Sequence, residues 1–305
     1  MGMRWIDDEI AGCMKALWES KPYTSEHTKE RWNSIAHEWG INDGTDLSRE
    51  ARYKRRVSET VRFLKEHQAL REDFDVIDVG CGPGRFVQAF AGTASHVTGT
   101  DISPDMLSLA QKRARNHNVF NVSFTDCDFH KTEPRDMGWE NRFDLVFSSI
   151  TPAVSRHEQF EKLNRMSRAY CFNASFMNNT RSLVRAVSHA LFNKEPVARW
   201  EDSTSYALFN LLWLAGYSPY VSYFSEAYDE QVCATRQSAG RIARCMDIPE
   251  ENGEEVSRIL HYLEQNADPD GILINHHRED YIWLLWDVRQ RTDRSGYHRQ
   301  WRIHE

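Results

Sequence analysis

The stretch from Val76 to Arg85 reads Val-Ile-Asp-Val-Gly-Cys-Gly-Pro-Gly-Arg and constrains the fold more than any other part of the chain. Its first four residues form a short, mostly apolar run with β-branched side chains, which is typical of a strand buried on both faces. Glycines follow at positions 80, 82 and 84, and a helix-compatible apolar pattern begins at Phe86. The stretch predicts a strand, a glycine turn and a helix whose N-terminus suits a carboxylate or a phosphate.

Two common nucleotide-binding motifs are absent from this turn. The dinucleotide-binding fingerprint needs a third glycine three places after its second, where this chain has Arg85 or Val87 depending on the register. A P-loop is also excluded, because no Gly-Lys-Ser/Thr sequence closes the turn. The turn therefore serves a different ligand or is an ordinary connection between a strand and a helix.

From Asp78 to Gly84 the sequence resembles the Asp-x-Gly-x-Gly-x-Gly motif of the class I S-adenosylmethionine (SAM)-dependent methyltransferases. A second segment, His96–Leu107, fits the same family. Its predicted strand ends at Asp101, about twenty residues after the first glycine, where an acidic residue can hold the two ribose hydroxyls. The two segments together favour a nucleoside-binding site over an ordinary turn.

Residues near these motifs extend the predicted cofactor contacts. Ile102 and Met106 are placed to cover a face of the adenine ring, since such pockets need apolar flanks. A third predicted strand ends at Asp126 and Cys127. The resemblance implies that an acid here accepts the adenine amino group and that the next backbone N–H meets the ring. Asp128 is an alternative to Asp126 in this role.

Two further segments resemble the same family. Phe143–Ile150 reads as a fourth strand, and the resemblance places its C-terminal end at the sulfonium side of the cofactor. Trp32–Trp39 resembles the aromatic-x-x-x-Ala-x-x-aromatic stretch of small-molecule members, in which the second aromatic often touches SAM. A helix with two core tryptophans is the alternative interpretation. The predicted cofactor-binding residues are Trp39, Asp78, Gly80, Cys81, Gly82, Gly84, Asp101, Ile102, Met106, Asp126, Cys127 and Ser148.

Strands and helices alternate over residues 71–177, and this alternation predicts a parallel sheet. The expected strands lie at about 75–79, 96–100, 121–125, 143–149 and 169–176. Two later strands, 220–226 and 281–289, flank helices expected at 229–246 and 250–266. We expect an α/β protein with a Rossmann-like, doubly wound, seven-stranded sheet, in which the resemblance implies that strands six and seven are antiparallel.

The same pattern predicts how the chain is organised. Residues 1–70 read as an N-terminal helical cap, which the resemblance suggests acts as a lid, and 71–228 as the SAM-binding core. Residues 229–277 read as a helical insertion, and 278–305 as the last strand of the sheet followed by a basic tail.

Composition limits the location and the partners of the chain. The net charge of −7, from 45 acidic and 38 basic residues, argues against a protein that wraps nucleic acid. Six cysteines without a Cys-x-x-Cys pair, and no signal peptide at the start, favour reduced thiols in the cytoplasm. The most apolar run, 207–216, is too short to span a membrane. His276 and His277 lack a third ligand at sensible spacing, so we expect no metal and place them in a loop.

These observations predict an enzyme that transfers a methyl group from SAM to an O, N, S or C atom of a small molecule, with S-adenosylhomocysteine as the product. Methyl transfer depends mainly on alignment, so a general base is needed only when the acceptor must lose a proton. His157 is a candidate base, and a solvent-facing histidine is the alternative interpretation. No other catalytic residue is identified.

Two other functions stay open. A tRNA or rRNA methyltransferase is one, although the Asp/Asn-Pro-Pro-Tyr turn used on nucleic-acid amino groups is absent after the fourth strand. A non-catalytic SAM-binding module is the other. The expected partner is a small-molecule methyl acceptor, without nucleic acid or membrane, and a homodimer is an open alternative to a monomer.

Overall fold

The computed structural model describes residues 8–19, 28–42, 47–196, 203–249 and 252–294. The chain forms two compact units. The first comprises residues 1–175, 203–222 and 283–305, and the second comprises residues 176–202 and 223–282. The four segments expected from the sequence, with boundaries at 70, 228 and 277, stay a prediction about the organisation of the chain.

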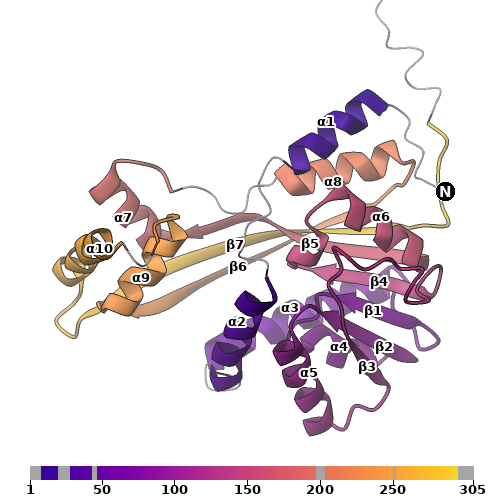
Figure 1. Ribbon diagram of the computed structural model, residues 1–305, viewed down its shortest axis with the longest axis horizontal. Helices are drawn as coiled ribbons and strands as arrows, with labels where there is room; N and C mark the ends of the chain where they lie inside the picture. The colour runs from indigo at the N-terminus through magenta and orange to yellow at the C-terminus, as the bar shows by residue number, and fades with distance from the viewer. Residues whose placement is uncertain (1–7, 20–27, 43–46, 197–202, 250–251, 295–305) are drawn as a thin grey trace, which may run out of the picture. The chain divides into compact units, whose positions relative to one another are not determined.

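A seven-stranded sheet has the order β3-β2-β1-β4-β5-β7-β6 (Figure 1). The first five strands pair in parallel, and β7 lies antiparallel between β5 and β6, which confirms the predicted Rossmann-like sheet. The strands are β1 Asp75–Val79, β2 His96–Asp101, β3 Val122–Asp126, β4 Phe143–Ser149, β5 Ser167–Arg181, β6 Tyr220–Cys233 and β7 Ile272–Asp287.

Helices of the first unit connect and flank these strands. The start of α5 shows why a helix forms there: Ser103 is the N-cap, its Oγ accepts from the Met106 N–H at 3.1 Å, and Pro104 occupies the first helical position. Helix α1 packs against α8 (Figure 1). The helices are α1 Asp8–Trp18, α2 Lys29–Asn42, α3 Leu47–Glu66, α4 Arg85–Ala91, α5 Pro104–Asn116, α6 His157–Met166 and α8 Ser203–Leu214.

The core of the first unit fixes the position of β4. Phe147 of β4 stacks on Phe172 of β5, with ring centroids 4.8 Å apart and an interplanar angle of 3°. Phe90 of α4 also contacts Phe147, edge-on at 4.8 Å. All three rings are buried, and aromatic pairs of this geometry add stabilisation beyond the area they remove from water.

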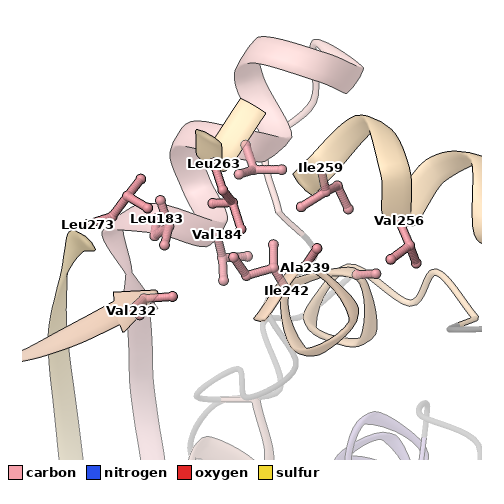
Figure 2. Packing of buried hydrophobic residues seen from close by; sticks show 11 residues of the cluster. Leu183, Val184, Val232, Ala239, Ile242, Val256, Ile259, Leu263 and Leu273 are labelled. Atoms are coloured by element: carbon pink, nitrogen blue, oxygen red, sulfur yellow. The ribbon is translucent and has the colours of Figure 1, made fainter. Parts of the chain in front are cut away.

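The second unit has its own apolar core. Helices α7 (Ser182–Phe192), α9 (Arg236–Cys245) and α10 (Gly253–Asn266) turn apolar side chains toward one another beside the ends of β6 and β7 (Figure 2). The labelled members of this cluster are Leu183, Val184, Val232, Ala239, Ile242, Val256, Ile259, Leu263 and Leu273.

Two expectations about the strands of the second unit are wrong. The helix expected from residue 229 begins at Arg236, because β6 continues to Cys233. Strand β7 begins at Ile272, so His276 and His277 lie in a strand and not in a loop. These strands place polar residues on the buried side, where His277 contacts the Glu230 carboxylate at 2.9 Å. The usual alternation of apolar and polar residues is therefore absent.

We predict that Ile259→Ala destabilises the second unit by about 2–5 kcal/mol, because Ile259 is fully buried in the cluster of Figure 2. Ile274→Ala is the matched control, since that side chain is 46% exposed and its loss should change stability by less than about 0.5 kcal/mol. Hydrogen exchange at the amides of α10 measures both effects. Equal protection in the two variants would contradict this assignment of the core.

Candidate functional site

Four neighbouring strand ends bring the predicted site residues together. Because β3, β2, β1 and β4 are parallel, their carboxyl ends lie at one edge of the sheet. Asp126 pairs with Asp101 in the register of β3 and β2, and Asp78 lies in β1 next to them. Ile150 follows β4 directly. The edge therefore presents Asp126, Asp101, Asp78 and Ile150 in this spatial order.

The turn after β1 has the conformation that its glycines permit. Gly80, Gly82 and Gly84 have φ values of 73°, 51° and 76°, in the left-handed region that favours glycine. A Cβ at Gly80 would lie 1.9 Å from Oγ1 of Thr151, so a side chain there would also collide with the segment after β4. The glycine at position 80 is thus required for both its backbone angle and its close packing.

Asp101 connects the glycine turn to the start of α5. Its Oδ2 accepts from the Gly82 N–H and its Oδ1 from the Ser103 N–H, both at 2.9 Å. Burial raises the pKa of this carboxyl group, and hydrogen bonds from the backbone N–H groups of Ser103, Gly82 and Ile102 act in the opposite direction. A carboxylate offers about four acceptor positions, so Asp101 can still accept from a hydroxyl group of a ligand.

Asp78 is a buried carboxyl group at the end of β1, with only 2% of its surface exposed. Its Oδ2 has no hydrogen-bond partner among the described residues. Burial, with a contribution from the Asp101 charge, raises the pKa of Asp78 to about 8. An unpaired buried carboxylate is costly, so this group fits the positively charged end of a ligand.

Helix α2 contacts the same edge of the sheet through two polar side chains. Lys29 Nζ lies 3.2 Å from Oδ2 of Asp126, whose side chain is exposed. Ser103 Oγ donates to Oδ1 of Asn33 at 2.6 Å. Trp39 belongs to α2, but its side chain lies outside the described part of the structure.

The remaining predicted residues near β2 and β3 differ in accessibility. Ile102 is half-buried, whereas Met106, in the first turn of α5, is fully buried. The Cys127 N–H already donates to the Asp101 carbonyl oxygen at 2.9 Å. Burial raises the pKa of the Cys127 and Cys81 thiols, which keeps both protonated. Neither thiol is therefore poised as a nucleophile.

Two predicted residues are engaged within the protein. The buried Ser148 hydroxyl donates to the Phe172 carbonyl oxygen at 3.2 Å and accepts from Asn173 Nδ2 at 3.0 Å, so it links β4 to β5 by side-chain hydrogen bonds.

His157 begins α6, and its Nδ1 lies 2.5 Å from Oε1 of Glu19. This pairing makes His157 part of the contact between α6 and the residue that follows α1.

The predicted fourth strand includes Ile150, but β4 ends at Ser149 and the chain turns directly after it. Ile150 has a φ of 50°, and Thr151 Oγ1 accepts from the Ala153 N–H at 3.2 Å. Thr151 followed by Pro152 is a recognisable start signal for a helical turn, and a short helix does span Pro152–Val154. No sequence signal indicates the backbone conformation of Ile150.

No three His, Cys, Asp or Glu side chains in the described part of the chain are grouped so that they could hold a metal ion. The helices that the structure describes include none with the length and apolar character needed to cross a membrane.

We predict that Gly80→Ala destabilises the chain more than Gly138→Ala. Gly138 has a φ of 68° but open space around it, so its substitution costs only the left-handed strain, about 1–2 kcal/mol. At Gly80 the collision with Thr151 adds about 1–3 kcal/mol. Urea unfolding measures the difference, and equal losses would mean that Thr151 moves aside freely.

Part of the chain is similar to known methyltransferases. Residues 70–212 match a family model described as a methyltransferase domain. The chain is 24% identical over 158 residues to 23S rRNA (uracil(1939)-C(5))-methyltransferase RlmD of Francisella tularensis subsp. holarctica (strain OSU18), covering 50% of this chain and 34% of the relative. It is 26% identical over 158 residues to ubiquinone biosynthesis O-methyltransferase of Methylococcus capsulatus, covering 46% and 63%.

A solved structure of magnesium protoporphyrin IX methyltransferase (ChlM) from Synechocystis PCC 6803 with bound SAH is 17% identical, covers 64% of this chain and 94% of its own, and gives a TM-score of 0.45. The chain spans about a third of the RlmD relative and less than two thirds of the ubiquinone enzyme. The matched residues 70–212 include all four strand ends. Less than half of the chain therefore matches a methyltransferase domain, and the sheet that contains the matched strands has a Rossmann-like order.

Proposed function

We propose that this chain is a SAM-dependent methyltransferase that acts on a small molecule and releases S-adenosylhomocysteine. The observation that carries the proposal is the row of Asp126, Asp101 and Asp78 at neighbouring strand ends, inside the part of the chain that matches the methyltransferase model. Three acidic side chains in a row suit a ligand that has an amino group, two hydroxyls and an ammonium along its length.

Asp101 is the proposed ribose ligand. The Gly82 and Ser103 N–H groups hold its two oxygens in a fixed orientation, so little side-chain entropy is lost when hydroxyls bind. The same bonds tie the carboxylate to the glycine turn, where the absence of Cβ atoms lets a ligand approach the backbone. Gly80, Gly82 and Gly84 are therefore proposed as part of the cofactor site.

Asp78 is the proposed partner of the ammonium group of the methionine part. Its unpaired Oδ2 would gain a charged donor, which would offset the cost of a buried charge. On the far side of Asp101, the exposed Asp126 would accept the adenine amino group after exchanging its contact with Lys29. An exposed ion pair of this kind is worth at most about 1 kcal/mol, so the exchange costs little. Trp39 and Ile102 stay proposed contacts of the nucleoside.

The bound cofactor supplies an electrophilic methyl group attached to a positively charged sulfur. The chain contributes alignment of donor and acceptor, which alone accounts for large accelerations of displacement reactions. His157 stays the candidate general base, with its Nδ1 beside the Glu19 carboxylate. An acceptor that attacks without losing a proton needs none.

The overall charge supports a small-molecule acceptor. The net charge of −7 is unfavourable for binding a polyanion such as RNA. The relative from Methylococcus is named for ubiquinone biosynthesis, and the relative from Francisella is named for ribosomal RNA. An RNA methyltransferase is therefore the alternative, and RNA binding that weakens steeply with salt would favour it.

Asp101→Ala is expected to weaken binding of S-adenosylhomocysteine about 10- to 100-fold, because hydrogen bonds to a charged group contribute about 1.5–3 kcal/mol. Asp105→Ala is the control, because Asp105 is an exposed acid in the first turn of α5, four residues away in the chain. Titration calorimetry with thermal unfolding of each variant tests both. Unchanged affinity in Asp101→Ala would remove Asp101 from the site.

The affinity for S-adenosylhomocysteine should rise with pH. The ligand-free Asp78, with its pKa raised to about 8, holds a proton at neutral pH, whereas a bound ammonium favours the carboxylate. Binding should therefore release a proton, and the dissociation constant should fall between about pH 6 and about pH 7.5. Calorimetry in buffers of different ionisation enthalpy counts that proton. Asp78→Asn should abolish both the proton release and the pH dependence, and their persistence would exclude Asp78.

A further inference from the structure

One buried ammonium group in the first unit takes no part in the methyl transfer described above. Lys162 of α6 has 6% of its surface exposed. Its Nζ donates to the carbonyl oxygens of Phe129, His130 and Thr132, at 3.2, 3.1 and 2.7 Å. The carboxylate of Glu133 lies 3.3 Å from the same nitrogen. A buried ammonium group is costly unless its three N–H donors are satisfied, and here four oxygens form a cation cage around it.

The cation cage belongs to a single helical turn that follows β3. The N–H groups of Lys131 and Thr132 both donate to the Asp128 carbonyl oxygen, at 3.0 and 2.9 Å. The last carbonyl oxygens of a helical turn have no partner within the turn. They carry partial negative charge, so a cation is favourable beside them. Lys162 supplies this cation from a different element of the fold.

The turn is connected to the last residue pair of β3. This strand lies at one edge of the sheet, and its pairing with β2 ends at Asp126, opposite Asp101. The next residue, Cys127, makes two contacts: its N–H donates to the Asp101 carbonyl oxygen at 2.9 Å, and its Sγ donates to Thr132 Oγ1 at 3.3 Å. Cys127 therefore joins the end of the strand to the turn that Lys162 holds.

The helix that carries Lys162 is anchored in the core. Phe160, Leu163 and Met166 lie close to Lys162 in α6, and all three are fully buried. A cation attached to such a helix has a fixed position, so the oxygens of the cation cage are held at a fixed place as well. The position of the turn after β3 is thus determined by α6.

We propose that the four oxygens form a cation-binding site that Lys162 occupies, and that Lys162 is a positioning residue, which holds the turn so that Asp126 meets the adenine amino group. This inference rests on the proposed function, because it presupposes adenine at Asp126. It also deepens that function, since it makes the selectivity for adenine depend on an internal cation that does not touch the ligand.

Binding of S-adenosylhomocysteine and of S-inosylhomocysteine to Lys162→Ala tests the positioning role. The second ligand has an oxygen in place of the adenine amino group, so the wild-type chain should prefer the first, because a carboxylate only accepts. In Lys162→Ala the dissociation constant for S-adenosylhomocysteine should increase about tenfold, and that for S-inosylhomocysteine at most about threefold. A merely structural role would weaken the binding of both ligands equally.

Added n-propylammonium tests the cation cage, because it replaces the atoms that Lys162→Ala removes. Hydrogen exchange at the amides of residues 127–133 in the ligand-free chain should be faster in Lys162→Ala and should slow again with n-propylammonium. The preference for S-adenosylhomocysteine should return with it. Tetramethylammonium has the same charge but no N–H donor, so it should restore neither.

Two further variants complete the test. Lys162→Met keeps the apolar stem without the charge, and it should lose the preference between the two ligands without responding to n-propylammonium. Lys131→Ala is the matched control, because that side chain lies on the same turn and is 86% exposed. Its exchange rates and both affinities should match those of the wild-type chain.

An unchanged preference in Lys162→Ala, equal losses for the two ligands, or rescue by tetramethylammonium would overturn the proposal. Unfolding of both Lys162 variants would assign a purely structural role and overturn it as well. If the wild-type chain binds neither ligand, the proposed function fails and the positioning role fails with it. Rescue of hydrogen exchange by n-propylammonium would still establish the cation cage, which distinguishes the two failures.

Discussion

The carboxylate of Asp101 is the interaction on which the rest of the candidate site depends. It accepts from the Gly82 N–H and from the Ser103 N–H, so one side chain fixes both the glycine turn and the first turn of α5. This glycine turn holds Gly80 against Thr151, and the contact fixes the position of the segment after β4. A single acidic residue at the end of β2 thus links the geometry of three strand ends.

The same edge of the sheet retains two features that oppose stability. Asp78 is a buried carboxyl group with an unpaired oxygen, and Ile150 holds a backbone conformation that suits glycine. Neither feature improves the packing of the ligand-free chain. The unpaired oxygen of Asp78 suits a cationic ligand, and unfavourable groups and backbone strain are typical of sites that are organised before the ligand binds.

The local signals in the sequence were sufficient for the sheet and for the strand ends that meet at the candidate site. The glycine turn, the acid at Asp101 and the cap at Ser103 each depend on a few adjacent residues. The features that the sequence did not predict depend on contacts between residues far apart in the chain. Strand β7 buries His277, which contacts the half-exposed Glu230 of β6, and this buried polar residue interrupts the apolar alternation of the strand. The conformation of Ile150 is imposed by β5, and the tail arginine Arg294 is buried because it donates to the Trp213 and Tyr217 carbonyl oxygens.

The most direct test of this account is a crystal structure of the chain with S-adenosylhomocysteine. We expect the adenine amino group at Asp126, the ribose hydroxyls at Asp101 and the ammonium at Asp78, with the sulfur between Asp101 and Asp78. A ligand bound in the reverse direction, or bound away from these four strand ends, would contradict it.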